Sequence, residues 1–134
     1  MLHVKNKILT NEGYRRLDAV KEGTRLIKGR IYDIFFVNSA LFYSIGFCNS
    51  RLQESSLTCS GDIFLLTPEG RLKVSDIKIG DRIVTYNAKD KIEEVKSITK
   101  VNKNKIKDAN TAIIITTEQT YIVEGFIISN DRLL

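Results

Sequence analysis

The sequence is poor in the residues that crosslink small proteins or bind metals. It has two cysteines, one histidine and one proline in 134 residues. Two cysteines are too few for a disulfide framework, and a structural zinc site needs about four Cys, His or carboxylate ligands. We therefore expect no metal and no cofactor. With one proline and eight glycines, the chain is neither a linker nor of low complexity.

Long apolar runs are also absent. No stretch of about 18 apolar residues occurs, so the sequence offers no membrane-spanning helix and we expect no membrane partner. Residues 1–7 lack the apolar segment of a signal peptide. We therefore expect an intracellular or virion setting, without secretion by a signal peptide. The length suits one domain over residues 1–134.

Positive charge is in moderate excess. The formal net charge is +5 and the isoelectric point is near 9.2, which permits contact with nucleic acid or an anionic surface. The lysine-rich residues 89–107 have acidic residues mixed in and no aromatic residues on which bases would stack. We favour a solvated face for this stretch. A basic protein that contacts nucleic acid remains an alternative.

The most informative feature is an internal repeat. Residues 8–27 and 65–84 align without a gap at an offset of 57 positions, and both glycines of each copy stay in step. Each copy predicts a short strand, a glycine turn, a second strand, an apolar anchor, a second glycine and a last strand. The last strands are expected to open at residues 25–27 and 82–84. Two copies predict two β lobes related by a pseudo-two-fold axis. The identical pairs are Leu9/Leu66, Thr10/Thr67, Glu12/Glu69, Gly13/Gly70, Lys21/Lys78, Gly23/Gly80 and Arg25/Arg82.

The remaining segments also predict strands. Residues 92–101 have apolar positions three apart, which fit a helix face as well as a strand, but Thr99 and Val101 are β-branched and favour the strand. Residues 102–110 are expected to form an exposed turn, and Glu124-Gly125 a tight one. These patterns predict about ten short strands, no helix and an all-β fold. Further strands are expected at residues 32–37, 40–47, 112–117, 121–123 and 126–128.

Three stretches carry motifs in a fixed order. Residues 1–27 contain a Leu-Thr pair before a glycine turn, residues 60–70 read SGDIFLLTPEG and are followed by IKIGD, and residues 120–130 read TYIVEGFIISN. In this order the motifs resemble those of the Hint superfamily, which includes inteins and Hedgehog-type autoprocessing domains. The resemblance spans Met1 to Asn130. It implies the horseshoe-like Hint fold, closed by residues 111–130.

The resemblance places Met1 where the family has its nucleophile. There an N-terminal Cys or Ser attacks the preceding carbonyl, and a thioether cannot do so. Ile63 takes the place of the histidine that protonates the leaving nitrogen. Ser60 keeps a hydroxyl at the family's threonine, but a lone hydroxyl is no acid–base catalyst near neutral pH.

The later positions are altered as well. Ala112 falls at the family's late aspartate, Gln119 at its histidine and Ser129 at the penultimate histidine. Asn130 retains the terminal asparagine. The next residue is Asp131, where splicing needs a Cys, Ser or Thr as second nucleophile.

These replacements predict little catalysis. Loss of one positioned acid–base group costs about 10²–10⁴ in rate. Apolar residues such as Ile63 and Ala112 predict a site closed by packing. Our first hypothesis is a catalytically inactive domain that serves as a structural or assembly module, with a virion as a natural setting. Its exposed strand edges would pair with protein partners or with further copies of the chain. The alternative is residual autoprocessing, in which Asn130 cyclises and the chain is cut before Asp131.

Two other reactive residues have simpler interpretations. Cys59 precedes Ser60, but no histidine or other base lies near it in the sequence, so we interpret it as a small buried apolar residue. His3 is expected to be a solvent-facing strand residue.

Overall fold

The computed structural model describes residues 1–130, which form thirteen β-strands and two single-turn 3-10 helices, η1 (Leu17–Ala19) and η2 (Val74–Asp76). Neither of these helices is long and apolar enough to cross a membrane. The all-β class expected from the sequence is confirmed. The strands are β1 (Leu2–His3), β2 (Lys7–Thr10), β3 (Gly13–Arg16), β4 (Ile31–Leu41), β5 (Tyr43–Cys48), β6 (Glu54–Cys59), β7 (Phe64–Thr67), β8 (Gly70–Lys73), β9 (Arg82–Asn87), β10 (Ile92–Asn102), β11 (Ile106–Thr116), β12 (Thr120–Val123) and β13 (Phe126–Ser129).

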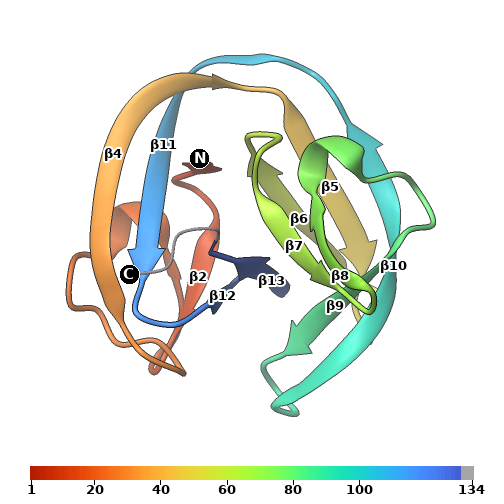
Figure 1. Ribbon diagram of the computed structural model, residues 1–134, viewed down its shortest axis with the longest axis horizontal. Helices are drawn as coiled ribbons and strands as arrows, with labels where there is room; N and C mark the ends of the chain where they lie inside the picture. Colours follow the sequence, from red (N-terminus) through yellow and green to blue (C-terminus); the bar gives the residue numbers. More distant parts are fainter. Residues whose placement is uncertain (131–134) are drawn as a thin grey trace.

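The strands form one antiparallel sheet that curls on itself. Its main path runs β3-β2-β12-β13-β9-β10-β5-β6-β1-β11-β4, with β7 and β8 attached through β13. Figure 1 shows two lobes, one containing β2, β4 and β11 and the other containing β5, β6 and β8–β10. The curled sheet is the horseshoe that the sequence predicted.

The two repeat copies adopt the same local structure. The Thr10 hydroxyl donates to the Gly13 carbonyl at 2.6 Å, and the Thr67 hydroxyl donates to the Gly70 carbonyl at 2.8 Å. Both glycines have positive φ, +102° and +126°, which ordinary side chains rarely adopt. Each turn leads through a four-residue strand into a 3-10 turn. The threonine and glycine identities therefore encode the same hairpin twice.

The strands that follow each copy exchange partners between the halves. β4 follows the first copy and pairs with β11, whereas β10 follows the second copy and pairs with β5. This exchange draws β1 between β6 and β11, with Leu2 opposite both Cys59 and Ala112. The start of the chain is thereby placed beside strands from its middle and its end.

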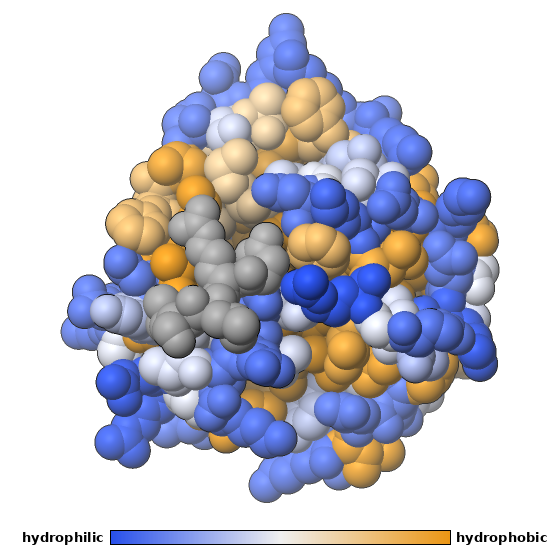
Figure 2. Space-filling model, in the orientation of Figure 1, coloured by the Kyte–Doolittle hydropathy of each residue, from blue (hydrophilic) through white to orange (hydrophobic). Residues whose placement is uncertain are grey.

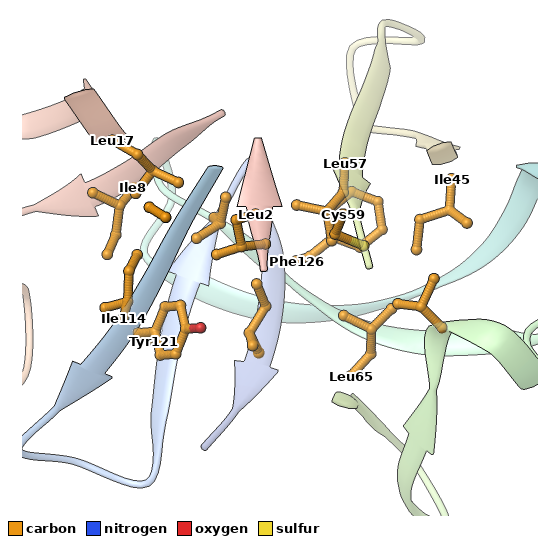
Figure 3. Close-up of a cluster of buried hydrophobic side chains, with 14 of the residues drawn as sticks. Leu2, Ile8, Leu17, Ile45, Leu57, Cys59, Leu65, Ile114, Tyr121 and Phe126 are labelled. Atoms are coloured by element: carbon orange, nitrogen blue, oxygen red, sulfur yellow. The ribbon is translucent and has the colours of Figure 1, made fainter. Parts of the chain in front are cut away.

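A shared apolar core joins the lobes. Matching positions of the repeat are fully buried in it: Ile8 and Leu65 on the first strand of each copy, and Leu17 and Val74 on the 3-10 turns. Figure 3 shows side chains from both halves converging around Leu2 and Phe126. Full burial of such a side chain is worth about 1.5–3 kcal/mol, so the core stabilises the pairing of the two copies.

Two local expectations were wrong. Residues 25–27 form no strand, and only Arg25 and Leu26 make isolated bridges. The chain reverses at once through Gly29 (φ +69°), where the Leu26 amide donates to the Gly29 carbonyl. The second copy instead continues into the six-residue β9. Residues 102–110 are no extended turn, since β11 begins at Ile106 and pairs with the end of β4. Only residues 103–105, with Lys103 and Lys105, connect the two strands, whereas Lys107 lies on β11.

Candidate functional site

The two ends of the described chain meet at one pocket. Met1 and Asn130 both line a cavity of about 180 Å³, which lies where β1, β11 and β13 meet residues 62–64. β1 delivers Met1 to it, and β13 delivers Asn130. The other lining residues are Leu2, Asp62, Ile63, Phe64, Ala112, Ile113, Ile114, Ile115, Tyr121, Ile128 and Ser129.

Ser60 fixes Met1 at the pocket. The Met1 nitrogen donates to the Ser60 hydroxyl at 2.6 Å, and the Ser60 amide donates to the Met1 carbonyl at 2.8 Å. The same hydroxyl hydrogen-bonds to the carboxylate of Asp62, which lies 3.9 Å from the Met1 nitrogen. The bond from Ser60, reinforced by the positive Met1 amine, lowers the pKa of Asp62. Ser60 therefore holds Met1 in place through both the backbone carbonyl and the amine of that residue.

The Met1 thioether lies against β11. The Thr111 hydroxyl lies 3.6 Å from the Met1 sulfur and 2.9 Å from the Val37 carbonyl, to which it donates. A thioether has no ionisable proton, and its sulfur is only a weak hydrogen-bond acceptor. At this position the side chain fills space beside a buried strand.

Asn130 is held by the turn that follows β11. Its side-chain nitrogen donates to the Thr116 hydroxyl at 2.5 Å and to the Glu118 carbonyl at 2.7 Å. Its backbone amide donates to the Gln119 carbonyl at 2.7 Å. A side-chain amide has two N–H protons, and both are engaged here. The bonds tie the end of β13 to residues 116–119.

The other sequence-predicted positions lie at or near the same pocket. Ile63 is half-buried and packs against the core, while Ala112 is fully buried opposite Leu2. Ser129 is half-buried on β13 and faces the pocket. Gln119 is exposed, lies outside the lining residues, and contributes its backbone carbonyl to Asn130. The fold thus brings Met1, Ile63, Ala112, Ser129 and Asn130 around one pocket.

The pocket is more polar than the sequence predicted. A site closed by apolar packing was expected, but the lining includes the Asp62 carboxylate and the Tyr121 phenol. Asp62 and Thr116 are the functional neighbours that sequence reasoning missed. The spacing of Ser60 and Asp62, two positions apart after a strand, was the available signal. Thr116 carried none, because its contact with Asn130 depends on the path of the chain between β11 and β13.

The surroundings of Cys59 and His3 determine how reactive these two side chains are. Cys59 is fully buried on β6, beside Leu2 of the neighbouring β1, and burial raises the pKa of its thiol to about 12. A thiol in that state is protonated and unreactive near neutral pH. Burial lowers the pKa of His3, whose Nδ1 accepts a hydrogen bond from the Lys5 amide. Within residues 1–130, no group of three or more His, Cys, Asp or Glu residues is arranged to hold a metal ion.

Several solved intein structures share this architecture. The DnaX mini intein from Spirulina platensis aligns over 96% of this chain and 98% of its own at a TM-score of 0.74 and 14% identity. The DnaB intein from Synechocystis sp. PCC 6803 aligns over 98% of both chains at 0.76 and 11%. The gp41-1 intein aligns over 96% of this chain and 97% of its own at 0.74 and 15%. No protein-family model and no curated protein sequence matches the chain. The chain therefore has the intein-type Hint fold over nearly its whole length.

Proposed function

We propose that this chain is a catalytically inactive Hint-fold domain that serves as a structural or assembly module, in a virion or another large assembly. The observation that carries the proposal is the composition of the pocket between its ends. A thioether lies at the nucleophile position, and an aliphatic side chain, Ile63, lies where the resemblance calls for an acid.

The polar groups at and beside the pocket, Asp62 and Ser60, take part in hydrogen bonds that stabilise the structure. Asp62 has a lowered pKa, so it is ionised and is a poor proton donor near neutral pH. The Ser60 hydroxyl is engaged by the Met1 nitrogen and by Asp62. These bonds hold β1 in the sheet, which supports retention of the fold without the reaction.

The competing function is cleavage after Asn130. Cyclisation requires the side-chain nitrogen of Asn130 to reach its own backbone carbonyl carbon. That movement breaks the hydrogen bonds to Thr116 and Glu118, each worth about 0.5–1.5 kcal/mol. Among residues 1–130, no histidine lines the pocket to offset the loss of these hydrogen bonds. The geometry therefore favours an Asn130 that anchors β13.

The test is an intact-mass experiment on a fusion protein. A reporter domain is joined after Leu134, with a second short extension before Met1, and the purified protein is followed by mass spectrometry for several days. We expect one unchanged mass. A fragment ending at Asn130, lost in the matched Asn130→Ala variant, would refute inactivity at that end. Release of the N-terminal extension that persists in the Asn130→Ala variant would refute inactivity at the Met1 end.

A nucleic-acid role is separated by a second measurement. Binding that depends on the lysines of residues 89–107 would weaken steeply with salt, because counterions are released from the phosphates. We expect no retention of labelled DNA or RNA at low salt. Salt-sensitive retention would favour the nucleic-acid function instead.

A further inference from the structure

The first strand after the repeat, β4, forms one end of the sheet. It is eleven residues long, Ile31–Leu41, and stands last in the strand order. β11 pairs with it along one side, and no other strand of residues 1–130 pairs with it. Figure 1 shows β4 on the outside of its lobe, with β11 on the inner side. The start of β4 already has partners, because Ile31 exchanges backbone hydrogen bonds with Gly23 and Thr24 and the Ile34 amide donates to the Asp33 carboxylate. Beyond these residues its outer side presents backbone groups that a further strand would complete.

Other sheet ends in this molecule are protected. The edge strands β3 and β8 have four residues each, and each carries two basic side chains: Arg15 and Arg16 on β3, and Arg71 and Lys73 on β8. Short length and charge are the usual devices against edge-to-edge pairing. β4 is nearly three times as long and has one charged residue, Asp33. The short length and the basic side chains that protect β3 and β8 are missing on this strand.

The side chains of β4 are also unusually apolar for a surface. Phe35, Phe36 and Val37 are consecutive and are 48%, 52% and 39% exposed. Tyr32 on the same strand and Ile113 on the adjoining β11 are exposed as well. Figure 2 shows hydrophobic surface at the upper left, over the region that β4 occupies in Figure 1. Because successive strand residues point to opposite faces, Phe36 lies on one face of the sheet, and Phe35, Val37 and Ile113 lie on the other. Exposed apolar side chains therefore flank this sheet edge on both faces, as is typical of an interaction site.

We propose that β4 pairs with β4 of a second copy of this chain, antiparallel and around a two-fold axis at Phe36. The inference rests on the proposed assembly role and names the partner. Such an interface is isologous, since the same strand serves both copies and antiparallel pairing joins the two sheets into one. It covers the exposed aromatic side chains and completes the backbone row in one step.

The sequence of β4 fits this register. A two-fold axis at Phe36 sets Phe36 opposite its own copy and Phe35 opposite Val37, so apolar residues meet at the centre. Asp33 falls opposite the neutral Ser39. The two Asp33 carboxylates are then six positions apart, about 20 Å at the usual strand rise, which exceeds the screening length of about 8 Å at physiological salt. In-register parallel pairing would instead place the carboxylates side by side.

The oligomeric state tests the proposal. Analytical ultracentrifugation over a concentration series should show a reversible dimer for the unaltered chain and a monomer for Phe36→Lys. Val95→Lys is the matched control. Val95 on β10 is similarly exposed, at 51%, but β10 is paired with β9 at this position, so the substitution leaves the edge of β4 unchanged. It should dimerise like the unaltered chain. Circular dichroism and urea unfolding verify that both variants fold. A monomer at all concentrations, or a dimer indifferent to Phe36→Lys, overturns the interface.

Cysteine crosslinking tests the register. In a Cys48→Ser background, which removes the exposed native thiol, Phe36→Cys sets two thiols opposite each other at a Cα separation of about 4.5–5.5 Å, and a disulfide accepts about 4.4–6.8 Å. We expect a covalent dimer on mild oxidation. Asp33→Cys alone should give none, whereas Asp33→Cys with Ser39→Cys should. Efficient crosslinking through Asp33→Cys alone would overturn the antiparallel register.

The two proposals fail in different assays. Cleavage of the fusion protein with an intact dimer refutes the inactive role and leaves the interface. A stable monomer, together with an unchanged mass of the fusion protein, refutes the interface but not the proposal that the domain is inactive.

Discussion

The burial of Cys59 on the strand next to β1 makes its thiol a reporter of how firmly the start of the chain is held. Cys59 is fully buried and lies opposite Leu2, which is itself 1% exposed. Burial raises the pKa of the Cys59 thiol from 9.0 to about 12, so near neutral pH its thiolate fraction is about a thousandfold below that of an ordinary thiol. Reaction of this thiol therefore requires the structure to open.

Shortening Leu2 should open the structure more often. A Leu→Ala change at a buried site costs about 2–5 kcal/mol, because contacts are lost and a cavity remains. If β1 must leave the sheet before Cys59 reacts, Leu2→Ala should accelerate its alkylation by about 30-fold at the lower limit of that range, since 1.4 kcal/mol is tenfold. The Ile79→Ala change, at an exposed residue, should leave the rate unchanged.

The assay is alkylation of the native protein followed by mass spectrometry. The exposed Cys48 supplies an internal reference and should react at once, which a Cys48→Ser variant would verify. Cys59 should react slowly in the native chain and fully in denaturant. Equal rates for Cys48 and Cys59 in the native protein, or no acceleration by Leu2→Ala, would refute the reasoning that the packing of β1 beside Cys59 protects the thiol.

Two further predictions follow from strained or buried groups. Gly29→Ala should destabilise the fold by about 1–3 kcal/mol in urea unfolding, because the new methyl group would clash with the Thr117 hydroxyl oxygen and the backbone has a positive φ. Gly23→Ala, with a positive φ but open space around it, should cost less, and an equal loss would contradict the steric explanation. Burial raises the pKa of Tyr14 from 10.0 to about 12, so the folded state disfavours its ionised form. The stability this contributes is complete below pH 10 and declines as the pH rises towards 12. Tyr14→Phe should flatten that decline in melting curves, and an unchanged pH dependence would contradict it.

The sequence predicted the local structure well where one segment encodes it. The threonine and glycine pairs specified the two hairpins, because a positive φ at Gly13 and Gly70 and a hydroxyl at Thr10 and Thr67 are local requirements. The β-branched residues also identified β10 as a strand. Prediction failed at residues 25–27, where the chain reverses at Gly29, and at residues 102–110, where pairing with the distant β4 makes a polar stretch extended from Ile106.

The candidate site divides in the same way. The sequence determined which chemical groups stand at Met1, Ile63 and Asn130, and so which reactions they are able to support. Only the tertiary structure decided that Ser60 and Asp62 hold Met1, and that Thr116 holds Asn130, because these contacts depend on the exchange of strand partners between the halves. Local preferences act over a few residues, whereas the meeting of two chain ends depends on the closure of the whole sheet.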